Sequence, residues 1–148
     1  MGIRYAVVGA TGNVGREILQ ILAEREVPAD DVTALASARS VGAEVSYGED
    51  DVLEVAELAG FDFNGTDIVL SSPGAQVSAE HSPRAAAAGA VVIDNTSCFR
   101  MDPDVPLVVP EVNPEALADW RNRGIIANPN CSTAQLVVAL KPLHMRAG

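Results

Sequence analysis

Short, mostly apolar runs along the chain alternate with stretches in which apolar residues recur at helical spacing. Residues 3–8 form the first apolar run, and the spacing of apolar residues through 13–25 predicts a helix, with Pro28 just beyond its end. Residues 32–37 form a second apolar run of strand length. Apolar strands that alternate with helices predict an α/β fold, a doubly wound and mostly parallel sheet.

The pattern continues to the end of the chain, with one less regular part. Glycines interrupt residues 41–65, where two short strands are expected. The last predicted helix begins at Cys131 and runs to about residue 141, and Pro142 is expected to kink or end it. The other expected strands are 44–47, 52–55, 67–71, 91–93 and 124–127, and the other expected helices are 76–88 and 114–121.

Composition narrows the set of possible partners. The chain has 148 residues, the size of one domain, and its formal net charge of −10 disfavours nucleic acid or an anionic membrane as a partner. Cys98 and Cys131 make no disulfide framework, which indicates a reducing compartment. The N-terminus enters a strand without a charged segment or a long apolar stretch, so a cytoplasmic protein is expected. The negative net charge still permits an anionic small molecule as a ligand, where Arg39 or Arg100 supplies a local positive charge.

Gly9, Gly12 and Gly15 follow the first predicted strand at intervals of three residues. One glycine permits the sharp turn from strand to helix, one lets a pyrophosphate approach the backbone, and one lets the helix pack closely on the strand. A glycine triplet alone is a weak signal. Here it ends a strand and begins an amphipathic helix, a context that favours a Rossmann-like nucleotide-binding turn over a purely structural one.

The residues after the second predicted strand bear on the choice between NAD and NADP. NAD-specific folds place an Asp or Glu there for the ribose 2′-hydroxyl, whereas this chain has Ser37, Arg39 and Ser40 and no carboxylate. A guanidinium and two hydroxyls suit a 2′-phosphate, so NADP is the predicted cofactor. The alternative is an arginine on a solvated loop.

Cys131 lies at the first turn of the last predicted helix, directly after an apolar strand. Only a thiolate is a good nucleophile, and the unpaired N–H groups and positive dipole end of a helix N-terminus stabilise it. The alternative is a small buried cysteine that happens to begin a helix. The polar neighbour Asn130 and the glycine-rich turn upstream favour the nucleophile. A nucleophilic thiol together with a nicotinamide cofactor indicates redox chemistry at the aldehyde–acyl level, through a thioester.

Arg100 lies just past the carboxyl end of the strand predicted at 91–93. Ligands bind at that edge of open α/β sheets, and arginine recognises phosphate or carboxylate with two parallel hydrogen bonds. Taken alone, such an arginine is more often a surface residue. Cys98 is expected to be a packed small side chain rather than a second reactive thiol. No metal site is expected.

Together these residues resemble the N-terminal half of the aspartate-β-semialdehyde dehydrogenases, an NADP-dependent enzyme family of the aspartate pathway. The resemblance is carried by residues 9–15 (GATGNVG), 36–40 (ASARS), 94–97 (DNTS) with Phe99 and Arg100, 108–113 (VVPEVN) and 128–133 (NPNCST). It covers essentially the whole chain, and the motifs at 108–113 and 128–133 are the specific ones.

Members of that family reductively dephosphorylate β-aspartyl phosphate to the semialdehyde, a step toward lysine, methionine, threonine and diaminopimelate. The resemblance implies that Cys131 is the acyl-thioester nucleophile, that Asn130 orients the substrate carbonyl and that Arg100 binds the substrate phosphate. It also implies a set of cofactor contacts, although Pro73 stands where the family often has alanine. These contacts are Thr11, Gly12, Asn13, Val14, Arg39, Ser40, Ser72 and Gly74.

The chain departs from the family's pattern in its length. It ends at Gly148, before the family's C-terminal α+β domain, which supplies a catalytic histidine, further substrate-binding residues and most of the homodimer interface. Residues 1–148 are expected to be an NADP-binding domain that ends with the nucleophile-bearing helix. His144 lies 13 residues beyond Cys131, about 20 Å along a continuous helix, and His81 lies inside an earlier helix. Neither can serve as the base, so we expect no appreciable activity from this chain alone.

Two other interpretations stay open. An N-acetylglutamyl-phosphate reductase shares the fold and the thioester chemistry, although residues 36–40 and 108–113 favour the aspartate enzyme. A non-catalytic NADP-binding module has no need of an activated Cys131, so thiol reactivity distinguishes it from an enzyme.

Overall fold

One sheet of seven strands crosses the computed structural model, which describes residues 2–147. The strands are β1 (Tyr5–Val8), β2 (Val32–Ala36), β3 (Glu44–Tyr47), β4 (Asp51–Glu57), β5 (Ile68–Ser71), β6 (Val91–Asp94) and β7 (Ile125–Ala127). They lie in the order β3-β4-β2-β1-β5-β6-β7. Every neighbouring pair is parallel except β3 and β4, which are antiparallel. The predicted doubly wound, mostly parallel α/β fold is therefore confirmed.

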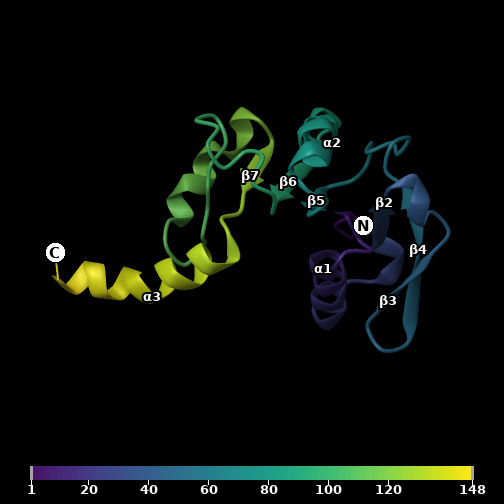
Figure 1. Cartoon of the computed structure of the whole chain (residues 1–148), viewed down its shortest axis with the longest axis horizontal. Helices are drawn as coiled ribbons and strands as arrows, with labels where there is room; N and C mark the ends of the chain where they lie inside the picture. The colour runs from purple at the N-terminus through teal and green to yellow at the C-terminus, as the bar shows by residue number, and fades with distance from the viewer. Residues whose placement is uncertain (1, 148) are drawn as a thin grey trace.

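The helices lie between the strands and on both faces of the sheet. Figure 1 shows α1 and α2 on opposite sides of the strands, as double winding requires. The α-helices are α1 (Asn13–Glu24), α2 (Ala75–Ala87) and α3 (Cys131–Ala147), and the 3₁₀ segments are η1 (Ala29–Asp31), η2 (Ala38–Ser40) and η3 (Pro114–Asn122). The helix predicted at 114–121 is thus the 3₁₀ segment η3 rather than an α-helix.

The last helix does not end near residue 141, although an end there is one of the two outcomes predicted at Pro142. α3 continues through Pro142 to Ala147. Proline lacks an N–H group, so it removes one hydrogen bond to the carbonyl four residues earlier. No described residue of α3 is buried, so water can satisfy that carbonyl. Pro83 lies inside α2 in the same way, which shows that this chain tolerates proline within helices at two places.

The two faces of the sheet carry separate apolar clusters. Successive side chains of a strand point to opposite faces, so neighbouring residues of β1 contribute to different clusters. Val7 packs with Leu19 and Leu22 of α1. Val8 belongs to the cluster that includes Ala85 of α2. β1 is therefore enclosed by α1 and α2 and lies at the centre of the fold.

The turn from β1 into α1 depends on glycine at two positions. Gly9 has a φ of 84°, in the left-handed region, and a Cβ there would lie 2.8 Å from the carbonyl oxygen of Ser72. Gly15 is buried in the first turn of α1. A Cβ on Gly15 would overlap the carbonyl oxygen of Gly9 and lie 2.8 Å from the Cα of Ala10. Of the roles predicted for the glycine triplet, the structure thus assigns the sharp turn to Gly9 and the close helix–strand packing to Gly15.

α3 follows β7 and extends away from the sheet toward the C-terminus (Figure 1). Several of its apolar side chains are exposed, including Leu136 at 57%, Leu143 at 62% and Met145 at 72%. The helix thus adds nothing to the buried core that the described residues form. Within residues 2–147, no helix combines the length and apolar character needed to cross a membrane.

The packing at Gly15 predicts a large effect of one methyl group. Gly15→Ala should lower the free energy of unfolding by about 1–3 kcal/mol, because α1 must move away from β1 to admit the Cβ. Gly60→Ala is the matched control, since a Cβ there meets nothing within 4 Å. Urea denaturation followed by circular dichroism measures both variants. Equal stabilities of the two variants would contradict the packing argument.

Candidate active site

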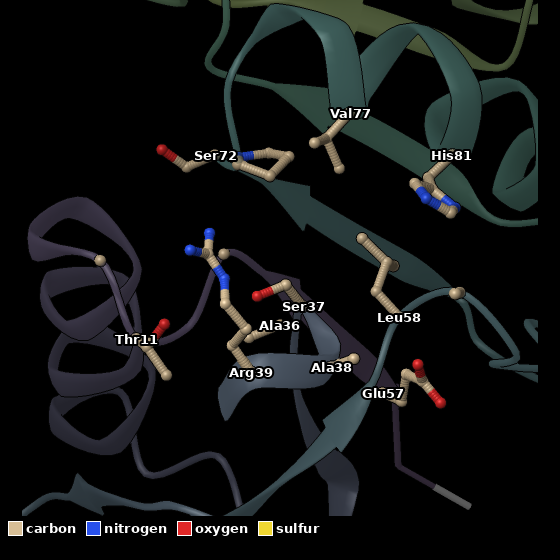
Figure 2. Close-up of a pocket in the computed structure, with 14 residues that line it drawn as sticks. Thr11, Ala36, Ser37, Ala38, Arg39, Glu57, Leu58, Ser72, Val77 and His81 are labelled. Atoms are coloured by element: carbon tan, nitrogen blue, oxygen red, sulfur yellow. The ribbon is translucent and has the colours of Figure 1, made fainter. Parts of the chain in front are cut away.

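A cavity of about 480 Å³ lies at the carboxyl ends of β1, β2, β4 and β5 (Figure 2). The chain leaves β1 toward β2 on one side and later returns to β5 on the other, so the strand order reverses beside β1. Ligands of open α/β sheets bind at such a reversal. The cavity is lined by Gly9, Thr11, Gly12, Ala36, Ser37, Ala38, Arg39, Glu57, Leu58, Ala59, Ser72, Pro73, Val77 and His81.

The end of the cavity beside α1 suits a phosphate group. Gly12 is the N-cap of α1 and offers no side chain to the first helical turn. Backbone N–H groups of a first turn have no partner within the helix, so they can bind an anion. The first turn begins with Asn13 and Val14, whose side chains are exposed. Neither residue lines the cavity, and neither does the buried Gly15.

The residues predicted to distinguish NADP from NAD divide into two groups. Ser37 and Arg39 line the cavity, and Figure 2 shows the Arg39 side chain extending toward Ser72. Ser40, in η2, does not line the cavity, and its backbone N–H donates to the Ser37 carbonyl at 2.8 Å. Gly74 also lies outside the cavity wall, as the N-cap of α2 with a φ of 105°. The structure thus brings Arg39, Ser37 and Ser72 to one space.

Sequence reasoning missed the cavity residues that come from β4 and α2. Glu57 is the last residue of β4 and pairs with Ala36 of β2, so a carboxylate does reach the cavity from the neighbouring strand. Figure 2 shows this carboxylate on the far side of the cavity from the Arg39 guanidinium. Val77 and His81 reach the cavity from α2. The only sequence signal for them was helical spacing, since residues 77 and 81 lie one turn apart.

Arg100 is held beside the ends of β6 and β7. Its Nε donates to the Asn128 carbonyl at 2.9 Å and its Nη2 to the Asn95 carbonyl at 3.1 Å. The side chains of these two asparagines also form a hydrogen bond, in which Asn128 Nδ2 donates to Asn95 Oδ1 at 2.7 Å. A guanidinium has five N–H groups, so several remain for an anion. The sequence prediction that Arg100 lies at this edge of the sheet is confirmed.

A buried carboxylate fixes the loop that carries Arg100. Asp94, fully buried at the end of β6, accepts the backbone N–H of Thr96 at 2.7 Å through Oδ1. Its Oδ2 accepts the hydroxyls of Ser82, at 3.1 Å, and Ser78, both on α2. A buried carboxylate needs such donors because burial without them is costly. This cluster ties the loop after β6 to α2.

Cys131 is the first residue of α3, and its thiol is exposed. Asn130 caps the helix: its Oδ1 accepts the backbone N–H of Ser132 at 3.0 Å and the Ser132 hydroxyl at 2.7 Å. The Cys131 thiol also points toward this oxygen, with Sγ 3.7 Å from it. The predicted position of the thiol at a helix start is therefore confirmed. The cap uses only the oxygen of Asn130 and leaves its Nδ2 as a donor for a ligand.

Cys98 has the packed environment that the sequence predicts. Its side chain lies against the cluster on the α2 face of the sheet and is partly buried. Burial raises the pKa of the Cys98 thiol, and the carboxylates of Asp94 and Asp102 raise it further. A raised pKa keeps the thiol neutral and unreactive over a wider pH range.

The sequence matches the family profile described as "Semialdehyde dehydrogenase, NAD binding domain" over residues 4–120. That range contains the whole cavity and Arg100. The chain belongs to the semialdehyde dehydrogenase family. A nicotinamide cofactor is therefore supported for this member of the family. Within residues 2–147, no three His, Cys, Asp or Glu side chains are grouped so that they can hold a metal ion.

Similar proteins carry the name aspartate-semialdehyde dehydrogenase. One from Aquifex aeolicus is 53% identical over 148 residues, which are 100% of this chain and 44% of that protein. Aspartate semialdehyde dehydrogenase II from Vibrio cholerae, complexed with ASA, has a TM-score of 0.91 and 52% identity, covering 98% of this chain and 47% of that one. The Candida albicans enzyme with NADP has a TM-score of 0.74 and 31% identity, over 98% of this chain and 48% of that one. The resemblance read from the motifs is confirmed, and this family member spans less than half the length of these relatives.

The two cysteines should differ sharply in alkylation. We expect iodoacetamide near neutral pH to label Cys131 first, because its thiol is exposed at a helix start. Labelling of Cys98 should need a more alkaline pH than an exposed cysteine does, because its thiol pKa is raised. Peptide mass spectrometry across a pH series measures both rates. Cys98→Ser should keep the fast reaction and Cys131→Ser should lose it; preferential labelling of Cys98 would overturn the assignment.

Proposed function

We propose that this chain is the NADP-binding and nucleophile-bearing part of an aspartate-semialdehyde dehydrogenase. The enzyme would reductively dephosphorylate β-aspartyl phosphate in amino-acid biosynthesis. One observation carries the proposal: a dinucleotide-type cavity and a thiol at a helix start lie along the same edge of one mostly parallel sheet. The names of relatives that match the whole chain support it.

The cavity residues fit an NADP molecule. The glycine turn has no side chains where a pyrophosphate would approach, and the N-terminus of α1 favours negative charge. Arg39 and Ser37 offer charge and a hydroxyl to a ribose 2′-phosphate. Glu57 lies away from Arg39 and does not compete for that phosphate. The proposed cofactor is therefore NADP rather than NAD.

The candidate catalytic residues divide the chemistry among themselves. Cys131 Sγ forms a C–S bond to the β-acyl carbon, the C–O bond to phosphate breaks, and Arg100 holds the departing phosphate. Asn130 Nδ2 donates to the acyl oxygen as negative charge develops there. The cavity residues would hold NADPH, which would supply the hydride that reduces the acyl group to the aldehyde level. The C–S bond then breaks, which releases the aldehyde and returns Cys131 as the thiolate that attacks in the first step.

Arg39 should decide the choice of cofactor. Arg39→Ala should weaken NADP binding by about 1.5–3 kcal/mol and NAD binding little, because a charge-assisted hydrogen bond to the 2′-phosphate is lost. Arg121→Ala removes the same charge outside the cavity and is the control. Isothermal titration calorimetry with each cofactor measures the effect. Equal losses for NADP and NAD would show that Arg39 does not contact the 2′-phosphate.

We further propose that residues 1–148 alone do not turn over. Proton transfer during formation and collapse of the tetrahedral intermediate needs a positioned base. His144 lies at the far end of α3 and His81 lies in the wall of the cofactor cavity, so neither is placed beside Cys131. A non-catalytic NADP-binding protein would also have no base beside Cys131. Activity after a relative's C-terminal half is added therefore distinguishes the two functions.

Complementation should restore phosphate-dependent NADPH formation from aspartate semialdehyde. The purified chain should show none by absorbance, and added C-terminal half of the Aquifex aeolicus relative should restore some. Cys131→Ser should reduce the restored rate on the order of 10²-fold or more, whereas Cys98→Ser should keep it. Robust activity of the 148-residue chain by itself would refute the need for a further base. Restored activity that survives Cys131→Ser would refute the thioester role.

A further inference from the structure

His81 lines the cofactor cavity at the end opposite the phosphate side (Figure 2). It comes from α2 and is only 7% exposed. Figure 2 shows it with Leu58 at the end of the cavity away from Thr11 and Arg39. Val77, one helical turn earlier on α2, also lines the cavity, between Ser72 and His81 in Figure 2. Apolar Leu58 and Val77 with a neutral donor on His81 suit an aromatic heterocycle, and the Glu57 carboxylate at this end (Figure 2) disfavours a phosphate.

The neighbour Arg84 fixes the tautomer of His81. Arg84 Nη1 lies 2.6 Å from His81 Nδ1. A guanidinium stays protonated and has no acceptor, so Nδ1 must accept this hydrogen bond and the neutral imidazole carries its proton on Nε2. Burial lowers the pKa of His81; the Glu80 charge opposes this shift and the Arg84 charge adds to it. The imidazole is therefore a neutral Nε2–H donor.

Arg84 is itself held in place. Its Nη2 donates to the Phe61 carbonyl at 3.1 Å, and its guanidinium carbon lies 5.8 Å from the centroid of the Phe63 ring. The Phe63 side chain is buried in the core. The donor that sets the tautomer of His81 is thus anchored to the segment between β4 and β5. This arrangement makes the orientation of the imidazole a property of the fold.

The Nε2–H group of His81 has no acceptor within hydrogen-bonding distance among residues 2–147. The closest carboxylate oxygen, on Glu80, lies 3.8 Å from Nε2, which is too long for a hydrogen bond. The Glu80 side chain is 72% exposed and interacts with solvent. The Nε2–H group of His81, beside apolar Leu58 and Val77, is therefore available to a ligand that has its own hydrogen-bond acceptor.

We infer that His81 reads the base of the bound nucleotide, with Nε2–H donating to an unprotonated ring nitrogen of adenine that lies between Leu58 and Val77. This inference rests on the proposed use of the cavity for NADP. Arg84 acts as a positioning residue, because it keeps the imidazole in the donor tautomer without contact to the ligand. The cavity then recognises the nucleotide at both ends, the phosphates through α1 and Arg39 and the base through His81.

The test compares ligands with and without a base. NADP and adenosine 2′,5′-bisphosphate carry adenine, whereas inorganic pyrophosphate carries none. His81→Phe keeps a flat ring and removes the donor, so it should weaken both adenine ligands by the same factor, on the order of three- to tenfold, and leave pyrophosphate binding unchanged. His81→Gln places an amide donor near the same position and should restore most of the affinity. Titration calorimetry on the 148-residue chain measures each dissociation constant.

The tautomer gives a second readout. Two-bond ¹H–¹⁵N spectra should show His81 as the Nε2–H tautomer in the wild type and a mixture of tautomers in Arg84→Met. If the wild type binds NADP and His81→Phe binds it with the same affinity, this inference is wrong but the proposed cofactor stands. Equal weakening of all three ligands by His81→Phe would have the same meaning. A wild type that binds no NADP would refute the proposed cofactor and this inference with it.

Discussion

Backbone hydrogen bonds join β1 to β2 on one side and to β5 on the other, both in parallel register. Parallel pairing continues through β6 and β7, so the carboxyl ends of these strands meet at one edge of the sheet. The loops that leave this edge carry the cavity, Arg100 and Cys131 in turn. The candidate site is thus a consequence of strand direction.

Local hydrogen bonds then convert this edge into a site. Arg100 bridges the carbonyls after β6 and β7, and Asp94 ties the same loop to α2. Asn130 caps the helix that begins with Cys131. The chain carries a formal net charge of −10, so the proposed anion binding would depend on a few cations at this edge and on helix N-termini rather than on an overall field. The structure supplies both, Arg39 beside α1 and Arg100 near α3.

The sequence predicted the sheet, the glycine turn and the helix that begins at Cys131, because each has a local signal in periodicity or spacing. It did not predict Glu57 or His81 in the cavity, since their positions depend on pairing of β4 with β2 and on packing of α2. It wrongly ended the last helix at about residue 141, because the exposure of α3, which lets water satisfy the carbonyl that loses its hydrogen bond, has no local signal. Single-residue signals were reliable where the backbone alone sets the structure, as at Gly9 and Gly15.

The central claim is that this edge of the sheet binds a dinucleotide along one continuous surface from α1 to α2. Backbone amide NMR spectra of the chain during a titration with NADP test it most directly. The account predicts shifts that concentrate at residues 9–15, 37–39, 57–59, 72–74 and 77–81, with little change in β3 or η1. Shifts that cluster elsewhere, or a spectrum unchanged at saturating NADP, would contradict it.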